Sequence, residues 1–186
     1  RLWSNVNPVR DELRFDLGRS LGSITKALSS FSHEAAHRRL DWDIANGLWI
    51  KKYLGLFTKE QRRVLKHFLR LFEKEKHGYD ELRKAVVHND SNDNNIVVTE
   101  DHIDPKIRAV IDFGDSVHTQ IINDLAIACA YAIMEYPDPL EAALPAVEGY
   151  NSSFPLEEKE LAYLYTAIGM RLVISVTKSA INKTKE

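Results

Sequence analysis

The stretch that decides the fold reads Val-Val-His88-Asn89-Asp90-Ser-Asn-Asp-Asn-Asn95-Ile-Val-Val and, after a polar turn, Arg-Ala-Val-Ile-Asp112-Phe-Gly-Asp115. Two short β-branched runs, 96–99 and 107–111, flank that turn, which predicts a β-hairpin. A hairpin brings its two outer loops together, and here both loops are rich in Asp and Asn. We therefore expect Asp90, Asn95 and Asp112 to face one spot, where hard oxygen ligands suit Mg²⁺.

The spacing of these residues is that of a phosphoryl-transfer site. In kinases an Asp of the catalytic loop accepts the proton of the substrate hydroxyl, a nearby Asn binds Mg²⁺, and the Asp of Asp-Phe-Gly binds the metal at the phosphates. The order His88-x-Asp90-x-x-x-x-Asn95, followed by Asp112-Phe-Gly, fits that template. The alternative is an acidic surface hairpin or a Ca²⁺ loop, but a calcium loop needs Gly and Glu where Asn95 and Asp101 stand.

The segment resembles the C-terminal lobe of the aminoglycoside phosphotransferase and choline kinase-like family, which has the protein-kinase fold. That family typically carries His-Gly-Asp-x-x-x-x-Asn, then Ile-Asp-Phe/Trp-Gly/Glu, then a helix start like Asn123-Asp124-Leu-Ala here. Asn89 stands where the family usually has Gly, and Asn tolerates left-handed backbone angles better than most residues. The resemblance covers essentially the whole chain. It is strongest to the branch of hydroxylysine kinase and of phosphotransferase domains fused to class III aminotransferases.

The resemblance implies the fold, the cofactors and the reaction. It implies a mainly α (α+β) lobe over residues 1–186, with helices around a catalytic hairpin at 85–115, and ATP and Mg²⁺ as cofactors. Asp90 would accept the proton of a small-molecule hydroxyl, while Asn95 and Asp112 bind Mg²⁺ and through it the nucleotide. Asp124 would hold the backbone of the catalytic loop, and we expect His88 to brace that loop without touching substrate.

Composition excludes several other classes. The chain has 186 residues, 44% of them hydrophobic and 28% charged, with a net charge of −2, which suits one soluble, cytoplasmic domain. It shows no basic stripe for nucleic acid and, by inspection, no apolar run long enough to span a membrane. Cys129 is the only cysteine, so internal disulfides are excluded and a buried small side chain is expected.

Helices are predicted on both sides of the hairpin. Leucines and other apolar residues at helical spacing predict a helix over 11–31, in which Gly18 and Gly22 favour close helix packing over a phosphate loop. Thr58-x-x-Gln61 is a capping box that opens a helix to about Lys76, and His77-Gly78 is expected to end it. Further helices are expected from a cap at Asn123 or Asp124 to about Tyr136, over 140–152, and after Pro155.

Three residues are candidates for contact with the substrate. Trp42 and Asp43 pair an aromatic face with a carboxylate, a combination that suits an amine. The alternative is that this pair anchors a short helix. Asp115 is a weaker candidate, either for orienting the metal site or for a cationic substrate. We therefore expect a small acceptor with a hydroxyl and an amine.

A complete kinase also needs a glycine-rich loop and a lysine that contact the phosphates. Neither Gly-x-Gly-x-x-Gly nor Val-Ala-Ile-Lys occurs here, so the small N-terminal β-lobe is expected to be missing and the chain alone to be inactive. A protein kinase is a weaker alternative, because there is no Ala-Pro-Glu and only a short segment between Asp112 and Asp124. A third alternative is a non-catalytic binding module with the kinase fold.

Overall fold

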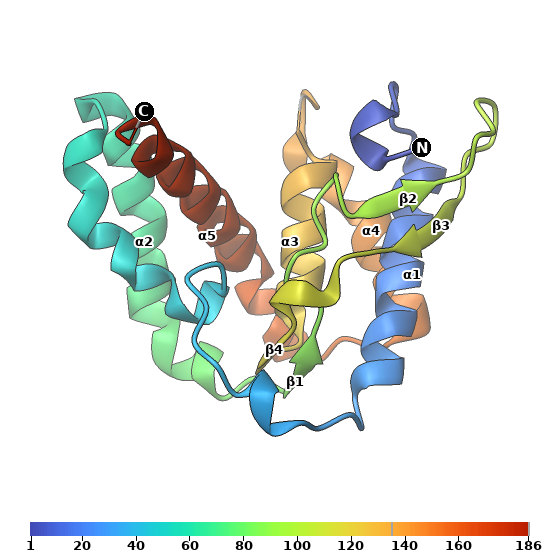
Figure 1. Ribbon diagram of the computed structural model, residues 1–186, viewed down its shortest axis with the longest axis horizontal. Coiled ribbons are helices and arrows are strands. Elements are labelled where there is room, and N and C mark those ends of the chain that lie inside the picture. Colours follow the sequence, from blue (N-terminus) through green and yellow to red (C-terminus); the bar gives the residue numbers. More distant parts are fainter. Residues whose placement is uncertain (135, 186) are drawn as a thin grey trace.

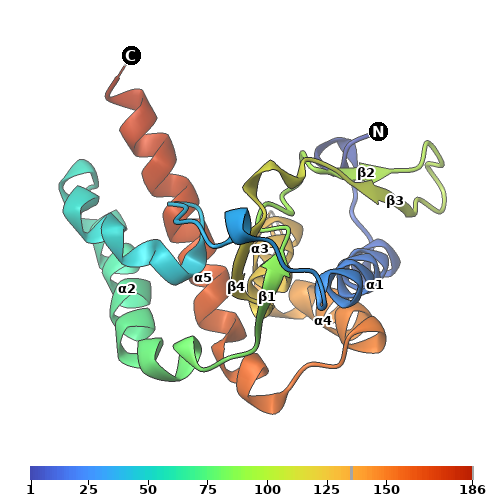
Figure 2. The same cartoon turned by 60° about the horizontal axis from the view of Figure 1, so that its bottom comes forward.

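The computed structural model describes residues 1–134 and 136–185, and it is mainly helical (Figure 1). Two views show α2 and α5 on one side of α3 and α1 and α4 on the other (Figures 1 and 2). The helices are α1 (Asp11–Leu28), α2 (Lys59–Asp80), α3 (Ile122–Ala132), α4 (Pro139–Ser153) and α5 (Glu158–Lys183). The 3₁₀ helices are η1 (Trp3–Asn5), η2 (Glu34–Ala36), η3 (Ile44–Leu56) and η4 (Phe113–Asp115). The predicted mainly α architecture is confirmed.

The strands form two small antiparallel sheets. β2 (Ile96–Val98) pairs with β3 (Ile107–Val110) as the predicted hairpin. β1 (Lys84–Val87) does not join that hairpin. It pairs with β4 (Val117–Gln120), a strand that the sequence did not predict. The expected catalytic hairpin over 85–115 is thus corrected. The hairpin itself spans 96–110, and a second sheet pairs the strand before this region with the strand after it.

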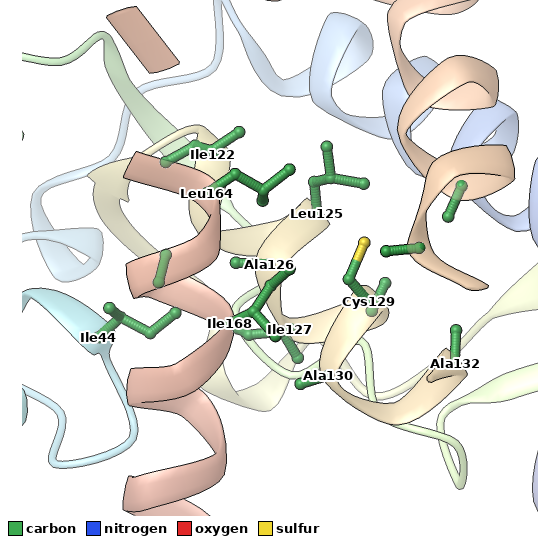
Figure 3. Packing of buried hydrophobic residues seen from close by; sticks show 14 of the residues in the cluster. Ile44, Ile122, Leu125, Ala126, Ile127, Cys129, Ala130, Ala132, Leu164 and Ile168 are labelled. Atoms are coloured by element: carbon green, nitrogen blue, oxygen red, sulfur yellow. The ribbon is translucent and has the colours of Figure 1, made fainter. Parts of the chain in front are cut away.

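Helix α3 is the centre of the core. Leu125, Ala126, Ile127 and Cys129 are fully buried, and Figure 3 shows them beside residues of α5 and η3. Burial raises the pKa of the Cys129 thiol to about 12, so this side chain is a small neutral part of the core. An apolar surface on nearly all sides of α3 explains why the other helices stand around it.

The α1–α4 contact is closed by glycines. A Cβ atom added to Gly18 would lie 1.8 Å from the carbonyl oxygen of Ala146, and one added to Gly149 would lie 2.0 Å from that of Phe15. A Cβ atom added to Gly22 would lie 2.7 Å from the carbonyl oxygen of Tyr150, also of α4. The prediction that Gly18 and Gly22 serve helix packing is confirmed.

Several predicted helix ends were wrong. α1 ends at Leu28, and Phe31, which was placed on its core face, is half exposed. α2 has the predicted capping box at Thr58 but continues to Asp80, because Gly78 does not end it. Instead, Gly78 lets the Tyr163 side chain of α5 approach the helix. α3 ends at Ala132, before the predicted end near Tyr136, and position 135 lies outside the described residues.

Helix α5 corrects the expectation that no apolar run is long enough for a membrane. It is 26 residues long, and an 18-residue window of it is apolar enough to meet that requirement. However, 56% of the window is buried inside the protein, and Leu164 and Ile168 contribute to the core cluster. We therefore interpret α5 as a core helix, since a buried core helix can be as long and as apolar as a membrane span.

Candidate active site

The loop after β1, which carries the candidate residue Asp90, is held in place by one carboxylate. Asp124 accepts hydrogen bonds from the backbone N–H groups of His88 at 2.9 Å and Asn89 at 2.7 Å. Asp124 is fully buried, and this burial raises the pKa of its carboxyl while the two N–H donors act in the opposite direction. The hydroxyl of Ser91 adds a hydrogen bond to the Asp124 carbonyl at 3.0 Å.

These contacts also correct the predicted cap of α3. The helix begins at Ile122, its N-cap residue is Ile121, and no side-chain hydrogen bond caps it. Asp124 therefore lies inside the first turn of α3 and directs its carboxylate toward the loop. The helix thus serves as a rigid support for the loop, as the resemblance implies for Asp124.

Asn89 has a left-handed backbone, with φ 64°. This conformation lets the chain turn between His88 and Asp90, and Gly adopts it without the steric cost of a Cβ. Asn89 is completely buried, and neither Oδ1 nor Nδ2 of its amide has a hydrogen-bond partner in the described chain. The expectation that Asn fits this position through left-handed angles is confirmed, at the cost of a buried amide.

Asn89→Gly is expected to stabilise the protein by about 1 kcal/mol, because the removal of left-handed strain and of an unpaired buried amide outweighs the chain entropy that glycine adds to the unfolded state. Asn89→Val should act in the opposite direction, since a β-branched residue is strained at positive φ. Thermal unfolding of both variants beside the wild type measures this. A loss of stability in Asn89→Gly would show that the amide has a partner in solution.

His88 links the two loops of the site. Its Nδ1 accepts a hydrogen bond from the Asp90 N–H at 3.2 Å, so Nε2 carries the proton and donates to the Ile111 carbonyl at 2.9 Å. The ring also packs edge-on against Phe113, with 4.6 Å between centroids. His88 is completely buried and therefore acts as a brace between the Asp90 loop and the segment that carries Asp112.

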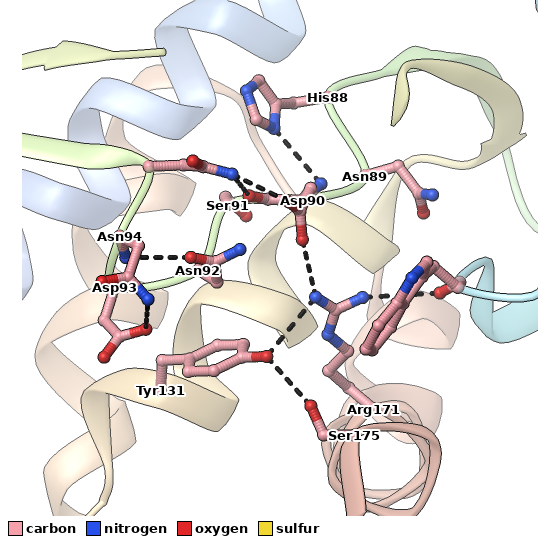
Figure 4. A network of polar contacts seen from close by, with 12 residues as sticks. His88, Asn89, Asp90, Ser91, Asn92, Asp93, Asn94, Tyr131, Arg171 and Ser175 are labelled. Atoms are coloured by element: carbon pink, nitrogen blue, oxygen red, sulfur yellow. Dashed lines mark hydrogen bonds and ion pairs between the residues drawn. The ribbon is translucent and has the colours of Figure 1, made fainter. Parts of the chain in front are cut away.

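The Asp90 carboxylate receives one donor on each oxygen (Figure 4). The Asn95 amide nitrogen donates to Oδ2 at 2.8 Å and also to the Asp90 carbonyl. Arg171 of α5 donates from Nη2 to Oδ1 at 2.8 Å. The Asp90 side chain is still 23% exposed, so a further group can reach it.

Asn95 and Asp112 have the free oxygen atoms that a metal site requires. Because Asn95 uses its amide nitrogen toward Asp90, its Oδ1 is free of hydrogen bonds in the described chain. Asp112 accepts from the Gly114 N–H with Oδ1 and keeps Oδ2 free among the described residues. The Ile111 N–H donates to the Asn95 carbonyl at 2.9 Å, which places Asp112 beside Asn95.

This donor set fits Mg²⁺ bound to a nucleotide. Among the described residues, no cluster of three His, Cys, Asp or Glu side chains forms a closed metal site. Mg²⁺ in phosphoryl-transfer enzymes is usually held by one or two protein carboxylates, waters and the phosphates of the substrate. One carboxylate and one amide oxygen therefore suit this metal, which takes its remaining ligands from elsewhere.

The structure separates the three predicted substrate residues. Asp115 lies in η4, half-buried, without an ion pair in the described chain. The ring of Trp42 faces two cations, with the Arg171 guanidinium 4.8 Å and the Lys178 nitrogen 5.7 Å from its centroid. An amine of a substrate would have to compete with both.

Asp43 is corrected from a substrate residue to an internal support. It is 4% exposed, and burial raises the pKa of its carboxyl. Its Oδ1 accepts from the Ala45 N–H and the Thr119 hydroxyl, both at 3.0 Å. The alternative that Asp43 anchors a short helix is the correct one, because it is the N-cap residue of η3.

Arg171 is the residue of this site that was not predicted. Its side chain is 1% exposed, and its guanidinium lies near the rings of both Trp42 and Tyr131. Figure 4 shows it between the Asp90 loop and Tyr131, whose hydroxyl is 3.0 Å from the Ser175 hydroxyl. The site therefore includes α5 as well as the loop, η4 and α3.

Two curated relatives illustrate the similarity of the sequence. The chain is 25% identical over 177 residues to a hydroxylysine kinase of Mus musculus, covering 89% of this chain and 47% of that protein. It is 26% identical over 172 residues to a hydroxylysine kinase of Danio rerio, covering 89% and 48%. The chain thus spans about half the length of these relatives.

Solved structures share the fold. The amicoumacin kinase hAmiN, in complex with AMP-PNP, Ca²⁺ and Ami, superposes with a TM-score of 0.67 at 18% identity, covering 93% of this chain and 52% of that one. An aminoglycoside-3′-phosphotransferase of type VIII gives 0.56 at 20% identity, covering 91% and 65%. The model of the phosphotransferase enzyme family matches residues 1–159. The chain belongs to that phosphotransferase enzyme family.

Proposed function

We propose that this chain is the catalytic lobe of an ATP-dependent kinase that phosphorylates a hydroxyl group of a small, amine-bearing molecule. The observation that carries the proposal is the Asp90 carboxylate. It is ionisable, 23% exposed, and oriented by a donor on each oxygen at the point where two loops of the site meet. A carboxylate in that position can accept a hydrogen bond from an attacking hydroxyl and then its proton.

Asn95 and Asp112 are proposed to hold Mg²⁺ on the phosphates of ATP. When bound, the metal and nucleotide would supply the transferable phosphoryl group and neutralise its charge. The residues of this chain would orient the groups around it: Asn95 through its bond to Asp90, and Asp112 through the backbone link from Ile111. The free oxygens of both side chains support this assignment.

The amine of the acceptor is proposed to meet Asp115. Of the three residues predicted for this role, only Asp115 keeps a partly exposed carboxylate without an ion pair in the described chain. Its neighbour Asp112 is the proposed metal ligand, so an amine at Asp115 would lie close to the reacting groups. The names of the hydroxylysine kinases lend support to an amine-bearing acceptor.

A nucleotide-binding lobe joined to this chain is part of the proposal. The chain covers 47–49% of the mammalian relatives and lacks the glycine-rich loop and lysine of a kinase. The function is therefore tested in a protein that carries this chain together with such a lobe. Phosphate transfer from ATP should be assayed with hydroxylysine, ethanolamine, choline, homoserine and an aminoglycoside, each beside its analogue without the hydroxyl. Absence of transfer to all five, despite Mg²⁺-dependent ATP binding, would favour a non-catalytic binding module.

Asp112→Ala in that two-lobe protein should weaken Mg²⁺-dependent ATP binding by at least about tenfold, because it deletes a charged metal ligand that the neutral Asn95 does not replace. Binding of ATP is titrated at several Mg²⁺ concentrations, with Asp101→Ala in the hairpin turn as the matched control. An unchanged Mg²⁺ dependence in Asp112→Ala would remove this residue from the metal site.

A further inference from the structure

Arg171 and Arg14 are the two largest fully buried side chains of the described chain. For Arg171, the ion pair present among these residues is the one with Asp90. A charged group in the interior is costly unless it is paired and hydrogen-bonded. Helix α5 therefore places a buried cation against the carboxylate on which the proposed function rests.

The guanidinium is fixed before any substrate arrives. It lies 4.8 Å from the Trp42 ring centroid and 5.6 Å from that of Tyr131, which holds its plane between two aromatic side chains. Nη2 is also 3.4 Å from the Tyr131 hydroxyl, and that hydroxyl is tied to Ser175, one helical turn beyond Arg171. Such a rigid fork orients a carboxylate better than a flexible ammonium group does.

The two donors on Asp90 come from different parts of the chain. Asn95 belongs to the same loop and moves with it, whereas Arg171 belongs to the core helix α5. With one donor on each oxygen, rotation of the carboxylate would break at least one short hydrogen bond. Each oxygen still has capacity for a second hydrogen bond, and the exposed part of Asp90 is where a hydroxyl can approach.

We propose that Arg171 is a positioning residue for Asp90, which sets the orientation of the catalytic carboxylate from helix α5. Arg171 is expected to act through Asp90, because its side chain is only 1% exposed and a substrate would not contact it directly. The inference rests on the proposed function, in which Asp90 orients the attacking hydroxyl. A misplacement of about 1 Å in such a site can lower the rate about 10²-fold.

The test is a double-mutant cycle in the two-lobe protein. Arg171→Met should lower kcat about 10²-fold, while ATP affinity and the KM of the acceptor change by less than about threefold. In an Asp90→Asn background the same change should lower kcat by less than about threefold, because a residue that acts through Asp90 has no further effect once the carboxylate is gone. Arg171→Lys, which keeps the charge, should recover part of the turnover.

Arg14→Met is the matched control. Arg14 is equally buried, but it is bonded to Asp11 and the Ala132 carbonyl. Its loss should reduce thermal stability and affect kcat by the same small factor with or without Asp90→Asn. If Arg171→Met lowered kcat equally in both backgrounds, or raised the KM of the acceptor with kcat unchanged, the positioning role would be wrong.

Thermal unfolding of the same variants separates this inference from the proposed function. Loss of the ion pair should make the effects of Asp90→Asn and Arg171→Met on the melting temperature non-additive, whether or not the protein transfers phosphate. Additive effects would overturn the Asp90–Arg171 contact itself. A non-additive cycle in a protein without any phosphate transfer would keep the contact and overturn the catalytic role assigned to Asp90.

Discussion

Asp90→Asn in the two-lobe protein is expected to reduce turnover about 10²–10⁴-fold, the usual effect of losing a placed general base. The substitution removes the group that is proposed to accept the proton of the hydroxyl. It also replaces two carboxylate oxygens by one, so the new side chain can accept from Arg171 or from Asn95 but not from both. Chemistry and orientation are therefore lost together.

Nucleotide affinity should change little in Asp90→Asn. The proposed metal ligands are Asn95 and Asp112, and the latter is held by its own bond to the Gly114 N–H. Turnover is measured at saturating ATP and acceptor, and ATP binding separately. Asp104→Asn makes the same charge change at an exposed carboxylate in the hairpin turn, outside the candidate site, and serves as control. Turnover near wild type in Asp90→Asn would show that another group accepts the proton.

The loop and the hairpin were predictable because their signals are local. The order from His88 to Asn95 and the Asp112-Phe-Gly run lie within a short stretch, where residue spacing alone places the groups. The residue type of Asn89 also indicated a left-handed backbone, and its φ of 64° confirms this. Capping boxes and helical apolar spacing likewise depend on neighbours a few positions apart, as at Thr58.

Contacts between distant segments were not predictable in the same way. β4 is four residues long and three of these are polar, so its pairing with β1 follows from the fold and not from its own pattern. Gly78 looked like a helix end because a glycine that ends a helix and one that admits a distant Tyr163 are identical in sequence. Asp43 beside Trp42 suggested a substrate contact. The Thr119 and Asn123 side chains that donate hydrogen bonds to Asp43 are far away in the chain, so the sequence did not reveal them.

Arg171 did leave a signal in the sequence. It is the only charged residue between Glu160 and Lys178, in a stretch otherwise apolar enough to resemble a membrane span. A single charge in such a helix must be buried with a partner or lie at a functional position. The pattern predicts that a partner exists, but only the fold shows that it is Asp90.

The chain of residues 1–186 by itself is expected to fold and to show no phosphate transfer. The core around α3 is made by all five helices of the described chain, so a helix-rich structure with a cooperative thermal transition should form without another lobe. The site, in contrast, offers phosphates only the oxygen ligands of Asn95 and Asp112, through a metal. No glycine-rich loop or paired lysine in the sequence supplies amides and positive charge on the other side.

Positioning and electrostatic stabilisation are nearly the whole of catalysis in phosphoryl transfer, so losing half of the contacts to the nucleotide should abolish turnover even with Asp90 intact. Circular dichroism during heating measures the folding, and transfer of labelled phosphate measures the activity, with the Asp90→Asn chain as a control for contaminating kinases. Because ATP affinity depends on the same missing groups, binding of ATP should be weak as well. Robust transfer by the 186-residue chain, absent in its Asp90→Asn variant, would mean that this lobe builds its nucleotide site from its own residues.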